Sequence, residues 1–288
     1  MAVESVLRQT FTDLELLVVD DGSTDGTMEA LADIADPRMK CLANPRNMGP
    51  SAARNAGIRS ARAEWVAFQD SDDEWLPQKL AKQMACLEAA PSQNVVACYT
   101  GMAILNQPEP NQKTRTVLSY IPPSDQRVVD GNLQEALLAR SFISTQMLMA
   151  RRNALLDIGG FDEQLPALED WDCAIRLAQK GHFVFVDEPL VLQTFSENSI
   201  TRNRRKWLQA RIHIVEKHYA ALAANPCILA GHHVAIAGEQ RRVGNLVAAR
   251  RCLQSARKLQ PYSFPLWLRT IRVWGLSLMP QKKPANRS

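Results

Sequence analysis

Several motifs that mark common enzyme and metal-binding classes are missing from this chain of 288 residues. There is no G-x-G-x-x-G, no P-loop, no G-x-S-x-G and no H-E-x-x-H, so the usual signatures of dinucleotide enzymes, P-loop NTPases, serine hydrolases and zinc proteases are absent. The six cysteines form no C-x-x-C pair and show no metal-ligand spacing. These absences argue against a zinc site and against a disulfide framework.

A long apolar run and a signal-peptide pattern are also missing. The nearest candidate for a membrane span, Phe264 to Met279, is interrupted by Arg269 and Arg272. A spanning helix needs about 18 or more consecutive apolar residues with few charges. We therefore expect a cytoplasmic protein.

A dense cluster of basic charge is likewise lacking, since the formal net charge is only +4. The basic excess lies mostly in the last third of the chain, at Arg202, Arg204, Arg205, Lys206, Arg241, Arg242, Arg250 and Arg251. A nucleic-acid binder usually carries a denser basic face with interleaved aromatic residues, so we expect no nucleic-acid partner. Peripheral contact with the anionic inner surface of a membrane stays open.

The residues that best indicate a function lie between Asn47 and Trp75. Residues from Ser51 to Ala63, rich in Ala and Arg, predict a helix, and Trp65 to Phe68 predicts a short buried strand. Three carboxylates follow that strand directly: Asp70, Asp72 and Asp73. Ligand sites of open α/β sheets lie beyond the carboxyl ends of strands, and clustered carboxylates favour a divalent cation such as Mg²⁺ or Mn²⁺. From the residues alone, a solvated turn is an equally good interpretation.

Three segments resemble glycosyltransferase family 2 in their order and spacing. They are Val18 to Asp25 (VVDDGSTD), Asn47 to Gly57 (NMG followed by ARNAG) and Phe68 to Trp75 (FQDSDDEW). The resemblance covers residues 1–201 and implies the α/β GT-A fold, a mostly parallel sheet flanked by helices. It also implies an inverting enzyme that moves a sugar from a nucleoside-diphosphate donor to a hydroxyl acceptor. The expected acceptor is a glycan, a lipid-linked molecule or a protein, in the synthesis of cell-surface or extracellular polysaccharide.

The same resemblance assigns the site residues by position. Asp72 with Asp70 would hold Mn²⁺ or Mg²⁺, and the donor nucleotide would be bound by Asp21, Gly49, Arg54 and Asp70. The catalytic base would be Asp170, in the acidic pair that opens a predicted helix from Leu168 to Ala178, with Glu169 and Trp171 toward the acceptor. Taken alone, this acidic start is better explained as charge that stabilises a helix N-terminus. The resemblance favours the base.

Two departures from the family pattern bear on activity. In the family a central first strand precedes the helix that is expected here from Met1 to Gln9, and without it the strand Leu14 to Val19 loses a neighbour. Gln193 to Ser199 contains no His or Arg, where the family often has a diphosphate contact. These departures predict impaired activity. They also leave open a truncated, non-catalytic transferase-like protein that acts through its helical tail.

Residues 202–288 predict an all-helical extension. Arg202 to Ala224 predicts one long helix, and residues 230–261, with Gly244 between two helical stretches, resemble one tetratricopeptide unit. A single unit cannot bury its own faces. We therefore expect it to pack on the preceding helix and on Trp267 and Trp274.

Overall fold

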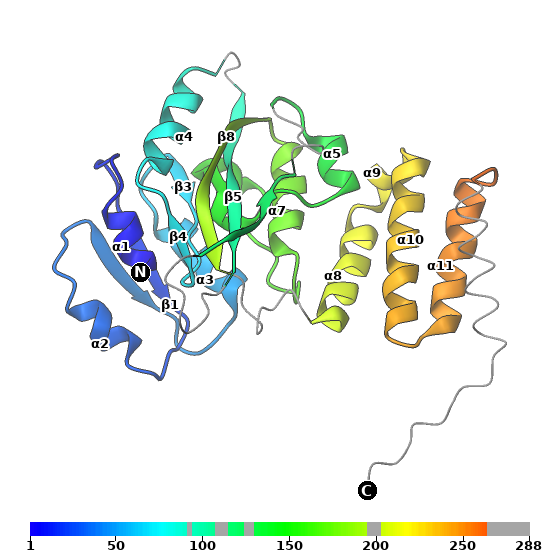
Figure 1. Ribbon diagram of the computed structural model, residues 1–288, viewed down its shortest axis with the longest axis horizontal. Coiled ribbons are helices and arrows are strands. Elements are labelled where there is room, and N and C mark those ends of the chain that lie inside the picture. The colour runs from blue at the N-terminus through cyan, green and yellow to red at the C-terminus, as the bar shows by residue number, and fades with distance from the viewer. Residues whose placement is uncertain (91–93, 107–114, 124–129, 195–202, 264–288) are drawn as a thin grey trace, which may run out of the picture. The chain divides into compact units, whose positions relative to one another are not determined.

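A computed structural model describes residues 1–90, 94–106, 115–123, 130–194 and 203–263 (Figure 1). The chain divides into two compact units, Met1–Ser199 and Ile200–Ser288, which are described separately. The expected tail contacts of Trp267 and Trp274 lie outside the described residues.

The first unit begins with alternating helices and strands. These elements are α1 (Ala2–Leu7), β1 (Leu16–Asp20), α2 (Thr27–Ala32) and β2 (Met39–Ala43). The two strands pair in parallel, with Leu16 opposite Met39 and Asp20 opposite Ala43. The apolar run LLVVD forms β1 and delivers Asp20 and Asp21 to its carboxyl end. In the described part of the chain, β1 and β2 make a two-stranded sheet of their own.

A larger sheet of six strands forms the centre of this unit (Figure 1). Its strands are β3 (Trp65–Ala67), β4 (Asp73–Trp75), β5 (Val95–Leu105), β6 (Val117–Ile121), β7 (Leu148–Arg151) and β8 (His182–Thr194). The order is β3-β7-β5-β8-β4, and β6 pairs with β5. The α/β architecture is confirmed, but the expectation of a mostly parallel sheet is wrong in detail. Of the described pairs, β1–β2 and β5–β8 are parallel, whereas β3–β7, β4–β8, β5–β6 and β5–β7 are antiparallel.

Helices pack around the two sheets. They are α3 (Pro50–Ser60), α4 (Lys79–Glu88), α5 (Gln134–Ala139), α6 (Arg152–Asp157) and α7 (Glu169–Ala178), with a 3₁₀ turn, η2, at Thr145–Met147. The central strand β5 is almost wholly buried because sheet neighbours flank it and helices α4 and α7 contact it. Tyr99 of β5 stacks on Phe185 of β8, with ring centroids 4.5 Å apart. This packed centre fixes the strand ends from which the candidate site is built.

A cavity of about 1300 Å³ is lined by residues of both sheets. It touches the consecutive residues Leu16 to Val19 of β1 and all of Trp65 to Ala67 of β3. Because successive strand residues point to opposite faces, a space that touches each of them runs along the strand edges. Helices α1 and α3 also contribute lining residues, among them Val6 and Gly57. The cavity therefore lies beside the edge of β1 and the edge of β3.

The second unit is helical. Its helices are α8 (Arg204–Lys217), α9 (Tyr219–Ala223), α10 (Pro226–Arg242) and α11 (Leu246–Leu259). The expectation of a single helix from Arg202 to Ala224 is wrong in its described part. Helix α8 ends at Lys217 and α9 begins at Tyr219, with His218 between them. Asn203, Asn225 and Asn245 cap α8, α10 and α11 by accepting a backbone N–H three residues on, as N-cap side chains do.

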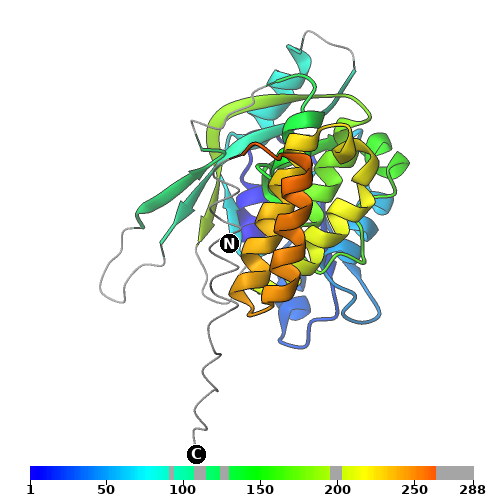
Figure 2. The same ribbon diagram turned by 90° about the vertical axis from the view of Figure 1, so that its right-hand side faces the viewer.

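Helices α10 and α11 form a hairpin and run side by side (Figure 2). Their contact is made mainly of small residues, with Ala230 and Ala237 facing Ala249, Leu253 and Ala256. Helix α8 also contacts α10, as expected for a helix pair that needs a neighbour. Membership of the tetratricopeptide class stays a prediction. Of the described helices, none combines the length and apolar character needed to cross a membrane.

Candidate active site

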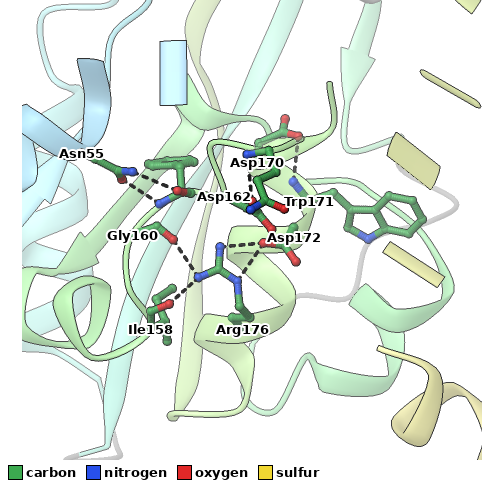
Figure 3. A network of polar contacts seen from close by, with 10 residues as sticks. Asn55, Ile158, Gly160, Asp162, Asp170, Trp171, Asp172 and Arg176 are labelled. Atoms are coloured by element: carbon green, nitrogen blue, oxygen red, sulfur yellow. Dashed lines mark hydrogen bonds and ion pairs between the residues drawn. The ribbon is translucent and has the colours of Figure 1, made fainter. Parts of the chain in front are cut away.

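The predicted base lies at the first turn of α7. This helix begins at Glu169, directly after Leu168, whose φ of 60° places it in the left-handed region that a leucine rarely occupies. Three carboxylates, Glu169, Asp170 and Asp172, stand in the first turn, where the helix dipole favours negative charge. The carboxylate Oδ1 of Asp170 accepts the backbone N–H of Trp171 at 2.7 Å, which orients the group (Figure 3).

The environment of Asp170 suits a proton acceptor. Burial, and after it the neighbouring charge of Glu169, raises the pKa of Asp170 to about 7. Arg54 opposes this rise and Asp70 adds to it. A general base works best when its pKa lies near the pH of operation. This raised pKa is compatible with the role of base that the family resemblance implies for Asp170.

Buried contacts hold α7 in place. Asp172 is fully buried and pairs with Arg176 one turn later, at 2.6 Å between Oδ2 and Nη2. Arg176 also donates through Nη1 to the carbonyls of Ile158 and Gly160, both at 2.7 Å (Figure 3). This network ties the helix to the loop that precedes it.

Trp171 belongs to the core. Its side chain is 1% exposed, and its indole N–H donates to the Leu137 carbonyl at 2.6 Å. The family resemblance had placed Trp171 toward the acceptor. In the structure the ring packs inside, so Trp171 supports α7 and offers no ring face to an acceptor.

Arg54 joins three distant parts of the chain. Its Nη1 donates to Glu169 Oε1 at 2.8 Å and its Nη2 donates to Asp70 Oδ1 at 2.7 Å. Burial opposes the charged form of Arg54, but Asp70 and Glu169 outweigh it and raise the pKa of the guanidinium. The end of β3, helix α3 and the start of α7 therefore meet at one ion-paired centre.

Asn55, next to Arg54 on α3, fixes the loop before α7. Its Oδ1 accepts the backbone N–H of Phe161 at 2.8 Å, and its Nδ2 donates to the Phe161 carbonyl and to Glu163 Oε1, both at 2.9 Å. Figure 3 shows Asn55 directed at this loop. No role for Asn55 was predicted from the sequence. Its position beside Arg54 in the ARNAG segment was the available signal.

The acidic residues after β3 diverge. Asp70 pairs with Arg54, while Asp72 is exposed. Asp73 is buried in β4, where its Oδ2 accepts from Gln146 Nε2 at 2.7 Å. Burial, with the nearby charges of Asp72 and Asp70, raises the pKa of Asp73 to about 7. The segment is thus more than a solvated turn, because its three carboxylates have three different environments.

A metal site at this strand end would depend on the carboxylates of Asp70 and Asp72. No three His, Cys, Asp or Glu side chains of the described residues are grouped closely enough to hold a metal ion. Asp72 and Asp70 nevertheless stand two residues apart at the strand end, with Asp72 open to solvent. Mg²⁺ is commonly held by one or two carboxylates and completed by substrate phosphates and water. The residues fit a cation that binds together with a diphosphate.

Asp21 and Gly49 form a separate contact. Asp21 Oδ1 accepts from Asn44 Nδ2 at 2.8 Å and from the Met48 N–H at 2.9 Å, and its Oδ2 accepts the Gly49 N–H at 2.7 Å. Burial would raise the pKa of Asp21, but these hydrogen bonds prevail and lower it. Gly49 has a φ of 91°, a conformation that favours glycine, immediately before α3. Hydrogen bonds thus group the predicted residues into two sets, Asp21 with Gly49, and Arg54 with Asp70 and Glu169.

Comparison with known proteins identifies the family of the chain. Residues 1–154 match Glycosyl transferase family 2. The chain is 45% identical over 95 residues to the succinoglycan biosynthesis protein ExoO of Rhizobium meliloti, a match that covers 33% of this chain and 27% of ExoO. It is 38% identical over 86 residues to WfaP of Escherichia coli, a UDP-Glc:alpha-D-GlcNAc-diphosphoundecaprenol beta-1,3-glucosyltransferase, with 30% and 34% of the two chains covered. The chain therefore spans about a third of the length of these two relatives.

Solved structures show the same fold. The mannosyltransferase PcManGT of Pyrobaculum calidifontis, in complex with GDP-Man and Mn²⁺, superposes with a TM-score of 0.59 at 19% identity, over 96% of this chain and 76% of that one. Its fold is the GT-A type of mixed sheet with flanking helices. Because the match to residues 1–154 extends over more than half of the sequence, the chain belongs to Glycosyl transferase family 2.

Proposed function

We propose that this protein is an inverting glycosyltransferase that moves a sugar from a nucleoside-diphosphate donor to a hydroxyl of a glycan acceptor. The observation that carries the proposal is the placement of Asp170. It opens α7, has its pKa raised to about 7, and is linked through Glu169 and Arg54 to the acidic strand end at Asp70. A base and a donor-side carboxylate thus share one ion-paired centre.

Asp170 would take the proton of the acceptor hydroxyl while its oxygen attacks the anomeric carbon of the sugar. The bond to the diphosphate breaks in the same step, and the leaving group departs on the opposite side. A single carboxylate acting as base fits one displacement with inversion, and general bases typically contribute about 10²- to 10⁴-fold to rate.

On the donor side, Asp21 and Gly49 would border the nucleotide, and Asp70 and Asp72 would hold a divalent cation. When bound, Mn²⁺ or Mg²⁺ would stabilise the negative charge that develops on the diphosphate. The lowered pKa of Asp21 keeps it ionised and able to accept hydrogen bonds. PcManGT, with GDP-Man and Mn²⁺ bound, has the same fold and supports this choice of donor and cation.

A lipid-linked acceptor in polysaccharide synthesis is supported by the names of two relatives. WfaP acts on a diphosphoundecaprenol-linked sugar, and ExoO serves succinoglycan biosynthesis. Such an acceptor would bring the protein to the inner membrane surface. Arg204, Arg205 and Lys206 are exposed at the start of α8 and could contact anionic lipid there.

A non-catalytic transferase-like protein that acts through its helical unit is the second candidate. The absence of His and Arg from Gln193 to Ser199, where the family resemblance implies a diphosphate contact, favours it. The two candidates differ in whether the chain turns over a donor.

The test is a panel of UDP- and GDP-sugars with Mn²⁺, incubated with the purified chain and a diphospholipid-linked acceptor. Transfer, or acceptor-independent release of the nucleoside diphosphate, by wild type and its loss in Asp170→Asn would support the enzyme. Binding of nucleotides without either reaction across the panel would favour the non-catalytic candidate.

A further inference from the structure

We infer that Arg54 is a positioning residue that holds the donor-side loop at Asp70 and the base-carrying helix α7 at Glu169 in one fixed arrangement. The sequence resemblance had placed Arg54 among the donor ligands. The catalytic consequence of this inference rests on the proposed function. The clamp, meaning the contacts of Arg54 with Asp70 and Glu169, is a property of the fold itself.

The two ends of the guanidinium bind two different carboxylates. Nη1 lies 2.8 Å from Glu169 Oε1 and Nη2 lies 2.7 Å from Asp70 Oδ1. These partners are 115 and 16 residues away from Arg54 along the chain. Because guanidinium is planar and its donors are rigidly spaced, it fixes the separation of the two carboxylates. A lysine, with one ammonium group on a flexible side chain, cannot hold both carboxylates at a fixed separation.

The position of Arg54 is itself fixed by packing. Its side chain is 15% exposed, and the guanidinium carbon lies 5.4 Å from the centre of the Phe161 ring. Phe161 is buried, meets Phe68 edge to face at 5.1 Å, and has its backbone held by Asn55. Arg54 is therefore a rigid bridge between its two partners.

This geometry disfavours direct donor binding by Arg54. Both terminal nitrogens already donate to carboxylates, and each partner is more than two-thirds buried, Glu169 being 17% and Asp70 31% exposed. These contacts use two of its five N–H donors, and with only 15% of its side chain exposed the guanidinium offers a diphosphate little accessible surface. The structure instead favours an effect on the chemical step, through the placement of the residue after Glu169, which is Asp170.

Arg54→Lys separates the two roles. Calorimetric binding of UDP and GDP with Mn²⁺ should stay within about threefold of wild type. The kcat for transfer should fall about 100-fold, since a misplacement of about 1 Å costs that much in rate. A fall of tenfold or more in nucleotide affinity with kcat preserved would overturn the inference and restore Arg54 as a donor ligand. Arg62→Lys is the matched control, because Arg62 pairs with Glu15 and is 72% exposed.

A double variant tests the route through Glu169. Glu169→Gln should lower kcat in the same way, and Arg54→Lys with Glu169→Gln should lose little more than either single variant. Losses that multiply would contradict an action of Arg54 through Glu169. The melting temperature of each variant is compared with that of wild type, so that a loss of activity caused by unfolding is distinguished from one caused by lost positioning.

One readout needs no turnover. The Asp172 N–H donates to the Leu168 carbonyl at 3.2 Å in the first turn of α7. Hydrogen exchange of a peptide that spans this turn should quicken about tenfold or more in Arg54→Lys and in Glu169→Gln, and stay unchanged in Arg62→Lys. If no donor in the panel is turned over, the proposed function fails, while this exchange still decides the clamp. Unchanged exchange in Arg54→Lys would refute it.

Discussion

The side-chain amide of Asn55 brackets the backbone of Phe161, accepting from its N–H at 2.8 Å and donating to its carbonyl at 2.9 Å. Helix α3 thereby holds the loop that leads into α7. The adjacent residue of that loop, Gly160, has no room for a side chain, since a Cβ would stand 2.2 Å from Asn55 Oδ1. The loop geometry upstream of Asp170 thus depends on an amide on one helix and a glycine on another segment.

Gly160→Ala should destabilise the first unit more than Gly159→Ala does. Both glycines have positive φ, 71° and 78°, so both variants carry backbone strain of about 1–2 kcal/mol. Only Gly160→Ala adds the clash with Asn55, because a Cβ at Gly159 meets nothing within 4 Å. The expected loss is about 2–4 kcal/mol for Gly160→Ala. Urea unfolding of both variants measures it, and equal losses would show that the loop shifts freely.

The rate of transfer should rise with pH through about 7. The pKa of Asp170 is raised to about 7 by burial and by Glu169, and a base acts in its ionised form, so activity is lost as pH falls below that value. Glu169→Gln removes a neighbouring negative charge and should shift the midpoint of the profile to lower pH. A pH profile of kcat/KM, which reports the pKa of the free enzyme, measures the midpoint independently of its plateau. A midpoint that moves upward, or none at all between pH 5 and 9, would contradict Asp170 as base.

Asp72→Ala should weaken Mn²⁺-dependent binding of UDP or GDP at least tenfold and leave the fold intact. Asp72 is exposed, and exposed substitutions usually change stability by no more than about 0.5 kcal/mol. Asp33→Ala, another exposed carboxylate in the same unit, is the control. Titration calorimetry with and without Mn²⁺ measures the effect. Equal metal-dependent affinity in the two variants would remove Asp72 from the cation site.

A β-strand supplied to the cavity beside β1 and β3 should stabilise the first unit. Met1 is one of the lining residues, so a designed segment of about five β-branched residues and a short turn, fused ahead of Met1, can reach it. New strand hydrogen bonds and apolar burial should raise the melting temperature by roughly 5–10 °C. A Gly-Ser fusion of equal length is the control. Equal melting temperatures would show that the cavity does not accept a strand.

Local features of the site were predictable from the sequence, but long-range ones were not. The helix expected from Leu168 begins at Glu169, and the strand expected from Trp65 to Phe68 spans Trp65–Ala67, because an acidic first turn and an apolar run act over a few residues. The bridge from Arg54 to Glu169 joins residues 115 apart, which no local pattern encodes. The burial of Trp171 was not predictable for the same reason, since its indole N–H donates to the Leu137 carbonyl of another helix.

Sheet pairing shows the same limit. The alternation of helices and strands predicted an α/β fold, yet β7 inserts antiparallel between β3 and β5, a choice made by packing across the sheet. The break at His218 in the expected tail helix was equally invisible, because the residues on both sides are good helix formers.

The role of Asp170 is tested most directly by comparing Asp170→Asn with wild type in transfer from the best donor of the panel. The variant keeps the shape of the side chain and removes its basicity, so nucleotide binding should persist while kcat falls at least 100-fold. The wild-type product should carry the inverted anomeric configuration, read by NMR. Near-normal turnover by Asp170→Asn would contradict the assignment of this residue as the base of an inverting transfer.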